Sequence, residues 1–260
     1  MTITLEGRRA LVTGGSSGIG EAIARALGAA GAKVAVNCNS HPEQGEAVAQ
    51  SIRDQGGQAF SVQADVSNPE AVAAMFKRLE AEWGGIDILV NNSGMDGKPA
   101  PVWEIDLESW RKVIEVNLFG AFHCAREALG RMVAQKSGVV LNITSVHEEI
   151  AWSGFSAYCA SKAGVSMMTK TLAQEAAPYG VRVLALAPGA IKTPINKNVW
   201  DNPEGLKDLL NKIPLNRMGE ASEIGNMAVV LVSDVAAYLT GRTVVVDGGM
   251  TDYPDFAHGG

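Results

Sequence analysis

At 260 residues, with 47% hydrophobic and 19% charged residues, the chain can bury a large core, and this composition argues against a disordered protein. The net charge of −6 is spread along the sequence, and no run of lysine and arginine marks a surface for nucleic acid or an anionic membrane. We expect one domain over residues 1–260, because α/β sheets covered on both faces commonly reach this length as a single unit.

The cysteines and the N-terminal segment predict the compartment. Cys38, Cys124 and Cys159 form no CxxC pair and no Cys/His cluster, which indicates reduced thiols and no metal site. Residues 1–7 lack a charged-then-apolar leader, and no apolar run approaches the roughly 18 residues of a membrane helix. We therefore expect a cytoplasmic protein with neither a membrane nor a nucleic-acid partner.

Short apolar runs alternate along the chain with longer segments of helical periodicity. The expected strands are residues 9–13, 33–37, 59–63, 87–91, 139–143, 182–187 and 243–246. The clearest expected helices are residues 21–27, 72–79, 110–132 and 157–176, where apolar residues recur three and four apart. Strands that are apolar throughout predict a doubly wound α/β fold, with about seven parallel strands and helices on both faces.

One irregular stretch, at about residues 188–215, is too long for an ordinary connection. Long segments of this kind often carry function. We interpret it as a flexible loop over the substrate.

A glycine-rich turn joins the first expected strand to the first helix. Residues 13–20 read Thr-Gly-Gly-Ser-Ser-Gly-Ile-Gly. Glycine permits a sharp turn and a close approach to a pyrophosphate, whose charge the helix N-terminal amides stabilise. The spacing is GxxxGxG rather than GxGxxG, and a purely structural turn is the alternative. The candidate cofactor-binding residues are Gly14, Ser16, Ser17, Gly18, Ile19 and Gly20.

The segment after the second strand bears on the choice of dinucleotide. Residues 37–40 read Asn-Cys-Asn-Ser, where an acidic residue would select NAD. No arginine is present to hold a 2′-phosphate, so the segment tolerates NADP without requiring it. We expect NADP, or dual use of NADP and NAD, with Asn37, Asn39 and Ser40 as candidate contacts.

Two further segments end expected strands at the edge where ligands bind in such sheets. Asp65 and Val66 are candidates for the adenine amino group, and a surface turn is the alternative for Asp65. Asn92, Ser93 and Gly94 follow the fourth strand. We expect these three residues to line the cofactor crevice.

Tyr158 and Lys162 lie four residues apart on an expected helix and therefore share one face. A free tyrosine titrates near pH ~10, and a nearby ammonium group and oxidised nicotinamide would lower that pKa by about one to three units. Ser145 follows the fifth strand, where its hydroxyl can hold a substrate oxygen while Tyr158 moves a proton. Each of these features has a structural alternative when it is taken alone. The Tyr158–Lys162 pair is also typical of an amphipathic helix surface, and Ser145 is typical of a turn. Asn117 is typical of a buried polar group that bonds to the backbone.

Residues 13–20 and 91–94, with Asn117, Ser145 and the Tyr158–Lys162 pair in this order, resemble the short-chain dehydrogenase/reductase family from end to end. The resemblance implies a Rossmann-type sheet, hydride transfer to or from a nicotinamide, and a catalytic tetrad of those four side chains. It also implies that Lys162 holds the nicotinamide ribose and that Asn117 supports a water chain. The implied nicotinamide neighbours are Pro188, Gly189, Ile191 and Thr193. A homotetramer packed through residues 110–132 and 157–176 is implied as well.

Residues 145–150, 188–196 and 247–254 resemble the bacterial glucose 1-dehydrogenases of this family. This resemblance implies a sugar or small polyol as substrate. The implied substrate-binding residues are Asp96, Ser145, His147, Tyr158 and Asn196.

Alternative functions stay open at this point. The glucose enzymes have glutamate in place of Asp96 and differ over residues 153–157, so an amino alcohol or another hydroxy compound is an alternative substrate. A 3-oxoacyl-carrier-protein reductase ranks lower, because Gln174 stands where those enzymes commonly have arginine and the chain is acidic. A nucleotide-sensing binding module is the non-enzymatic alternative, and the intact tetrad argues against it.

Overall fold

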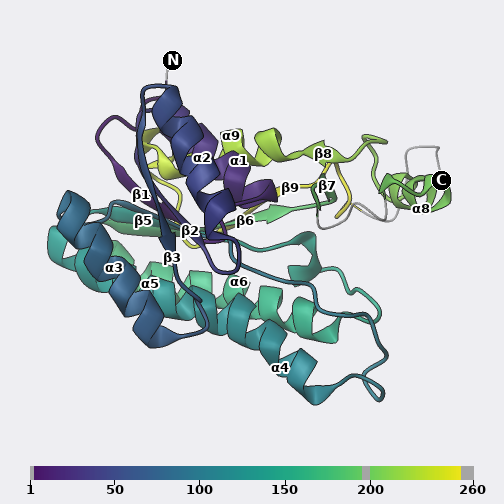
Figure 1. The fold of residues 1–260 in the computed structure, drawn as a ribbon. Coiled ribbons are helices and arrows are strands. Elements are labelled where there is room, and N and C mark those ends of the chain that lie inside the picture. Colours follow the sequence, from purple (N-terminus) through teal and green to yellow (C-terminus); the bar gives the residue numbers. More distant parts are fainter. Residues whose placement is uncertain (1–2, 195–199, 253–260) are drawn as a thin grey trace.

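A computed structural model describes residues 3–194 and 200–252, and its centre is a parallel sheet (Figure 1). The sheet has seven strands in the order β3-β2-β1-β4-β5-β6-β9. The strands are β1 (Arg9–Val12), β2 (Lys33–Cys38), β3 (Gln58–Gln63), β4 (Ile88–Asn91), β5 (Gly138–Ile143), β6 (Val181–Pro188) and β9 (Thr243–Val246). Every neighbouring pair is parallel, as the apolar runs predict.

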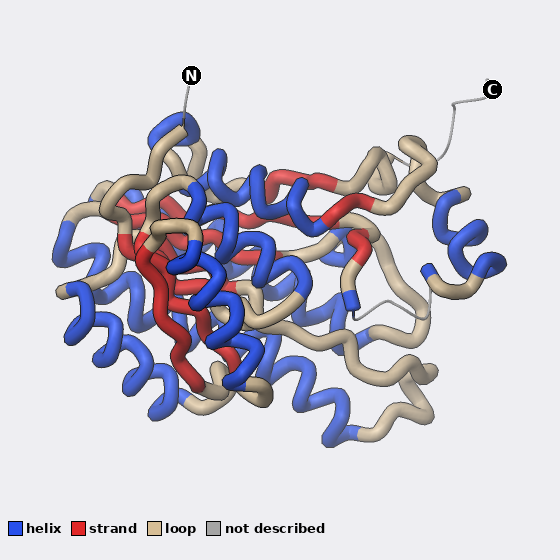
Figure 2. The backbone as a smooth tube through the Cα atoms, turned by 45° about the horizontal axis from the view of Figure 1, so that its top comes forward, coloured by secondary structure: helices blue, strands red, loops and turns tan. Residues whose placement is uncertain are grey.

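Helices cover both faces of this sheet (Figure 2). One face carries α1 (Gly18–Ala29), α2 (Pro42–Asp54) and α9 (Ala221–Val232), and the other carries α3 (Pro69–Trp83), α5 (Gly120–Gln135) and α6 (Ser156–Ala176). Successive side chains of β1 alternate between the two cores, with Ala10 and Val12 in one and Leu11 in the other. The doubly wound α/β prediction is confirmed.

The helix expected over residues 110–132 is wrong in one respect, because it is interrupted. The structure has α4 (Leu107–Ile114), a π-helical turn η1 (Glu115–Phe119) and then α5. The side chain of Asp106 caps α4 by accepting a hydrogen bond from the Ser109 N–H at 2.7 Å. The π turn contains Asn117, and such turns occur frequently at functional sites.

The stretch expected to be a flexible loop contains regular structure. Strand β7 (Ile191–Lys192) pairs with β8 (Gly219–Glu220), and α8 (Pro203–Leu210) lies between them in the chain. In Figure 1, α8 projects beyond this small sheet, away from the seven strands. No helix among residues 3–194 and 200–252 is long and apolar enough to cross a membrane.

Candidate active site

A cleft of about 280 Å³ lies at the carboxyl ends of β1, β4, β5 and β6. Parallel α/β sheets bind ligands at this edge. The lining residues are Gly14, Ser16, Ser17, Gly18, Ile19, Gly20, Asn92, Ser93, Gly94, Met95, Asp96, Ile143, Thr144, Ser145, Tyr158, Lys162, Pro188, Gly189, Thr193 and Pro194. The cleft therefore gathers segments that are far apart in the sequence.

The glycine-rich turn forms one end of this cleft. Gly14 and Gly18 have φ angles of 60° and 56°, a region that glycine enters without strain. A Cβ atom at Gly20 would lie 2.2 Å from the Gly14 carbonyl oxygen. Because α1 begins at Gly18, its unpaired N-terminal amides and the bare glycine backbone form a cradle that fits a pyrophosphate.

A hydrogen-bond network holds the turn against the end of β4. The Thr13 Oγ1 atom accepts hydrogen bonds from the backbone N–H groups of Asn92 and Ser93, each at 3.0 Å. In return, the Asn92 side-chain amide donates to the carbonyls of Thr13 and Gly14, at 3.0 and 3.1 Å. Asn92 thus supports the turn with its side chain while it lines the cleft.

Asn37 also supports the turn. It is buried, and its Oδ1 atom accepts a hydrogen bond from the Gly14 N–H at 3.3 Å. Its Nδ2 group donates to the carbonyls of Val62 and Ala64, at 3.3 and 3.0 Å. The side chain is engaged by backbone groups, so the structure gives it a supporting place beneath the candidate cofactor site.

The candidate adenine end lies beside the ends of β2 and β3. Asn39 and Ser40 are exposed, and Asp65 accepts hydrogen bonds from the N–H and hydroxyl of Ser67, at 2.9 and 2.6 Å. Burial raises the pKa of Asp65, but the Ser67 hydrogen bonds and the Lys112 ammonium outweigh it and lower the pKa below its ordinary value. Val66 itself is buried.

Lys162 and Tyr158 meet in the middle of the cleft. The Lys162 side chain is buried, donates a hydrogen bond to the Ile143 carbonyl at 2.9 Å, and places its Nζ atom 5.6 Å from the centre of the Tyr158 ring. Burial lowers the pKa of Lys162 to about 8, and the carboxylates of Asp96 and Glu148 oppose this shift.

The pKa of Tyr158 departs from the sequence-based expectation. Burial raises it to about 12, the Ser145 hydrogen bond acts in the opposite direction, and the Asp96 carboxylate adds to the increase. The expected lowering includes the charge of an oxidised nicotinamide, and without that charge the effect of burial is the larger one. Desolvation of the phenolate is the larger effect, and a sequence gives no measure of it.

Asn117 joins the loop after β4 to helix α6. Its Oδ1 atom accepts a hydrogen bond from the Met95 N–H at 2.8 Å, and its Nδ2 group donates to the Met95 carbonyl at 2.9 Å and to the Ser161 hydroxyl at 3.0 Å. Ser161 in turn donates to the Tyr158 carbonyl at 2.7 Å. Asn117 thus holds the position of the loop that carries Asp96 relative to Tyr158.

Asp96 lines the cleft, whereas His147 is absent from its lining and meets the Tyr158 ring edge-on, with centroids 6.1 Å apart. The His147 Nδ1 atom is 3.0 Å from the Ile150 carbonyl oxygen, which can only accept, so Nδ1 carries the proton and Nε2 is an acceptor. Burial lowers the pKa of His147 and thereby favours this neutral form, whereas burial raises the pKa of Asp96. Asn196 lies outside the described residues.

An aromatic stack forms the wall beside these two residues. The His147 ring stacks on Trp152 with centroids 4.6 Å apart, and Trp152 stacks on Phe155 at 3.8 Å. Trp152 also meets Tyr158 edge-on at 5.9 Å. The residue pattern does not predict the stacking of Trp152 with His147.

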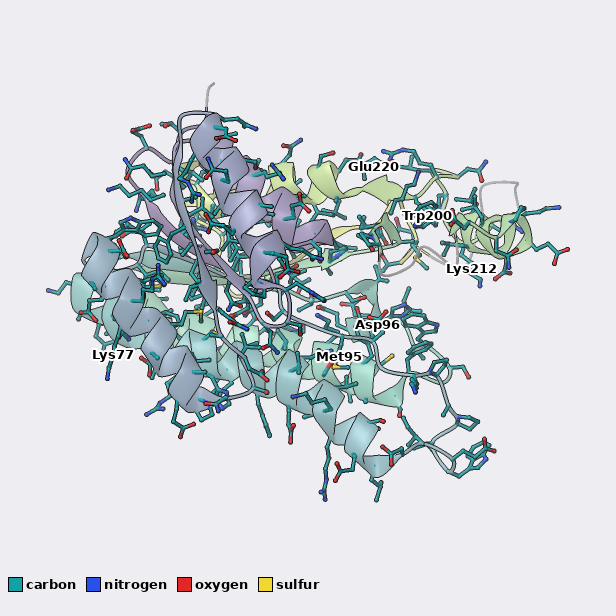
Figure 3. The ribbon with its side chains drawn as sticks, viewed as in Figure 1. Lys77, Met95, Asp96, Trp200, Lys212 and Glu220 are labelled. Carbon is teal, nitrogen blue, oxygen red and sulfur yellow. The ribbon has the colours of Figure 1, made fainter. Side chains whose placement is uncertain are left out.

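The segment after β6 closes the cleft from the other side. Pro188, Gly189 and Thr193 line the cleft, whereas Ile191 is buried and pairs with β8. In Figure 3, Met95 and Asp96 lie on the loop after β4, and Trp200, whose indole N–H donates to the Thr193 carbonyl at 3.2 Å, lies on the opposite side.

The cleft also contains residues that sequence reasoning did not propose as contacts. Met95, Thr144 and Pro194 line it, each next to a predicted motif. Proximity to the ends of β4, β5 and β6 is the signal that would have found them. No group of three or more His, Cys, Asp or Glu side chains within the described ranges is arranged to hold a metal ion.

Comparisons with known proteins agree with this geometry. A family model described as enoyl-(acyl carrier protein) reductase matches residues 14–251. The chain is 44% identical over 256 residues to 3β-hydroxysteroid dehydrogenase 1 of Eggerthella lenta, covering 98% of each chain. It is 43% identical over 251 residues to glucose 1-dehydrogenase 2 of Bacillus subtilis, covering 96% of this chain and 97% of that one.

A solved gluconate 5-dehydrogenase from Burkholderia cenocepacia, in complex with NADP and tartrate, superposes with a TM-score of 0.92 at 35% identity. The match covers 97% of this chain and 98% of that one. The chain belongs to the short-chain dehydrogenase/reductase family, and it is an NAD(P)-dependent oxidoreductase that acts on CH–OH groups.

Proposed function

We propose that this oxidoreductase acts on a sugar or small polyol. The observation that carries the proposal is a pair of hydrogen-bond acceptors near Tyr158. They are the Asp96 carboxylate in the cleft lining and the Nε2 atom of neutral His147, whose ring centroid lies 6.1 Å from that of Tyr158. Two acceptors near the candidate proton-transfer group favour a substrate that brings several donors of its own. A polyhydroxylated substrate satisfies this requirement. An amino alcohol satisfies it as well and is the alternative within the same chemistry.

In this proposal, each residue of the tetrad has its own role in the reaction. The bound dinucleotide supplies or accepts the hydride. Tyr158 gives its hydroxyl proton to the substrate oxygen in reduction and takes it back in oxidation, while the Ser145 hydroxyl holds that oxygen. The Lys162 ammonium stabilises the ionised Tyr158, and the Asn117 hydrogen bonds keep the loop in position.

The cofactor residues follow from the same cleft. Gly14 and residues 16–20 would hold the pyrophosphate, with Asn92, Ser93 and Gly94 opposite them. The exposed Asn39 and Ser40 leave room for a 2′-phosphate without an acidic residue to repel it. We therefore assign NADP, or dual use of NADP and NAD, to this chain.

A hydroxysteroid is the second candidate substrate. Met95, which lines the cleft, and Trp152, which meets Tyr158 edge-on, are 36% and 38% exposed and give the surroundings of Tyr158 an apolar surface. The 44% identity to a 3β-hydroxysteroid dehydrogenase supports the same possibility. The two acceptors rank it below the polyol, because a steroid ring system brings few hydroxyl donors.

The Tyr158→Phe variant tests the proton-transfer role. Because the hydroxyl moves the proton and does not hold the dinucleotide, we expect turnover to fall by about 10²–10⁴-fold while dinucleotide affinity changes little. Lys162→Ala should reduce both quantities. Retention of more than about a tenth of wild-type turnover by the Phe variant would contradict the assignment, since loss of general acid–base catalysis costs more than that.

The substrate class is tested by a screen of sugars, polyols, amino alcohols, hydroxysteroids and acetoacetyl thioesters, each with NAD and with NADP. We expect the highest kcat/KM with a polyhydroxylated compound. Faster turnover of a hydroxysteroid or a thioester would overturn the substrate proposal. Dinucleotide binding with no turnover of any compound would favour a nucleotide-sensing module.

We also propose a cytoplasmic homotetramer. Phe119, Phe122 and Met167 are about half exposed, at 51%, 46% and 60%, and the helical segments that carry them are those expected to pack between subunits. Large apolar side chains at a surface often mark an interface between chains. Light scattering measures the subunit number, and a monomer would refute this proposal.

A further inference from the structure

A second carboxylate lies behind the candidate catalytic pair. The short helix η2 (Val146–Glu148) follows Ser145 directly and packs against α6. The Glu148 Oε1 atom accepts a hydrogen bond from the Ser166 hydroxyl at 2.8 Å. Its Oε2 atom is buried and has no hydrogen-bond partner among the described residues. Because a buried carboxylate is normally paired or fully hydrogen-bonded, this arrangement requires a compensating charge nearby.

That charge belongs to Lys162. Ser166 lies four residues after Lys162 on α6, so the group that holds Glu148 is on the same helix face one turn further along. Lys162 is itself buried, and its hydrogen bond to the Ile143 carbonyl is with a neutral group. The Glu148 carboxylate raises the pKa of Lys162 against the effect of burial.

Each element around Lys162 contributes a different group. The loop after β4 contributes the Asp96 carboxylate, α6 contributes Tyr158, and η2 contributes Glu148. Strand β5 and the π turn contribute neutral groups, the Ile143 carbonyl and the Asn117 amide. Two carboxylates on two separate segments therefore favour the charged form of one buried ammonium group.

We propose that Glu148 is a positioning residue whose buried carboxylate, held by Ser166, stabilises the ammonium form of Lys162. Asp96 lines the cleft, so a substrate that donates a hydrogen bond to its carboxylate weakens the interaction of that carboxylate with Lys162. Glu148 is absent from the cleft lining and is held by a residue of the protein. Glu148 thus keeps Lys162 charged while Asp96 is engaged with a ligand. The catalytic consequence rests on the role proposed above for Lys162.

The test is an NMR titration of the protein without dinucleotide, with ¹³C-labelled lysine and a Lys162→Arg variant to identify the signal. Glu148→Gln keeps the shape of the side chain and removes its charge. We expect it to lower the titration midpoint of Lys162 by about half a pH unit or more, because an opposite charge nearby is lost. The matched control is Glu149→Gln, which removes the charge of the adjacent exposed carboxylate and should leave the midpoint unchanged.

Two further variants separate charge from structure. Glu148→Asp keeps the charge and should keep the midpoint closer to wild type than Glu148→Gln does, whereas a merely structural role predicts equal midpoints. Ser166→Ala releases the carboxylate and should lower the midpoint by a smaller amount, which also provides the test if Glu148→Gln does not fold. An unchanged midpoint in folded Glu148→Gln, or an equal shift in Glu149→Gln, overturns the proposal.

The pH profile of kcat distinguishes this proposal from the proposed function. If the Lys162 midpoint and the kcat profile shift together in Glu148→Gln, both proposals are supported. If the midpoint shifts and the profile does not, the catalytic role of Lys162 is refuted while the role of Glu148 stands.

Discussion

The substitution Gly20→Ala adds a single methyl group where the turn and the end of β4 are in closest contact. The new Cβ atom would lie 2.2 Å from the Gly14 carbonyl oxygen and 2.4 Å from the Asn92 side-chain nitrogen. Real Cβ atoms essentially never approach other heavy atoms closer than 3.0 Å. The turn must therefore move by roughly 1 Å to free the Gly14 carbonyl, and the Asn92 amide must shift as well, since overpacked sites relieve strain by small shifts.

The expected cost follows from these contacts. Overpacking costs about 1–3 kcal/mol, and loss of the two Asn92 hydrogen bonds costs about 1 kcal/mol each. The helix propensity of alanine returns up to about 1 kcal/mol. We expect the free energy of unfolding to fall by about 2–4 kcal/mol and dinucleotide affinity to fall with it, because the moved turn is the proposed pyrophosphate cradle.

Gly130→Ala is the matched control. Gly130 is exposed on α5, and a Cβ there would meet nothing within 4 Å, so the same substitution should stabilise the protein by about 0.5–1 kcal/mol. Chemical denaturation measures both stabilities, and tryptophan fluorescence during dinucleotide titration measures affinity. Wild-type stability and affinity in Gly20→Ala would refute the argument about the cradle.

Two other predictions concern charge. Asn39→Arg should raise the NADP/NAD ratio of kcat/KM by about tenfold, because a guanidinium adds a charge-assisted hydrogen bond to a 2′-phosphate, and an unchanged ratio would show that the phosphate lies elsewhere. The pKa of Lys162 is about 8 in the folded protein, against an ordinary value of 10.5. Because the folded protein binds this proton more weakly than the unfolded chain does, the stabilisation is complete above pH ~10.5 and is lost as the pH falls through about 8. Lys162→Met should therefore lose this pH dependence, whereas Lys170→Met, at an exposed position of the same helix, should keep it. Equal pH dependence in the two variants would contradict the shift.

The sheet could be predicted from the sequence because buried parallel strands are apolar on both faces. All seven expected strands occur, and no end is displaced by more than one residue. The hydrogen-bonded ladder extends past the apolar run at Cys38 and Pro188 and ends before it at Val12. The π turn at 115–119 could not be predicted, because a change from i+4 to i+5 bonding leaves no signature in residue type. Helix α8 could have been found, since Asn202 followed by Pro203 is a strong helix start and Asn202 does cap it.

Part of the candidate site could likewise be predicted from the sequence, and part could not. Residues in local motifs, such as the glycine turn and the Tyr158–Lys162 pair, line one cleft. Contacts between distant segments were not predicted, among them the Lys162 hydrogen bond to the Ile143 carbonyl and the engagement of Asn37 by backbone groups. The pKa of Tyr158 belongs to this second class, because its direction depends on how fully the fold removes the phenol from water.

The buried polar groups of the site are separated from the two apolar cores. Asn117, Ser145, Ser161, Lys162 and Ser166 are all buried, and all lie on α6 or on segments packed against it near the carboxyl edge of the sheet. Burial of such groups costs stability, and the apolar side chains on both faces of the sheet offset that cost from elsewhere in the molecule. The fold should therefore tolerate changes of charge at this edge, such as those at Glu148 and Lys162, better than changes of shape at the glycine turn, where backbone meets backbone.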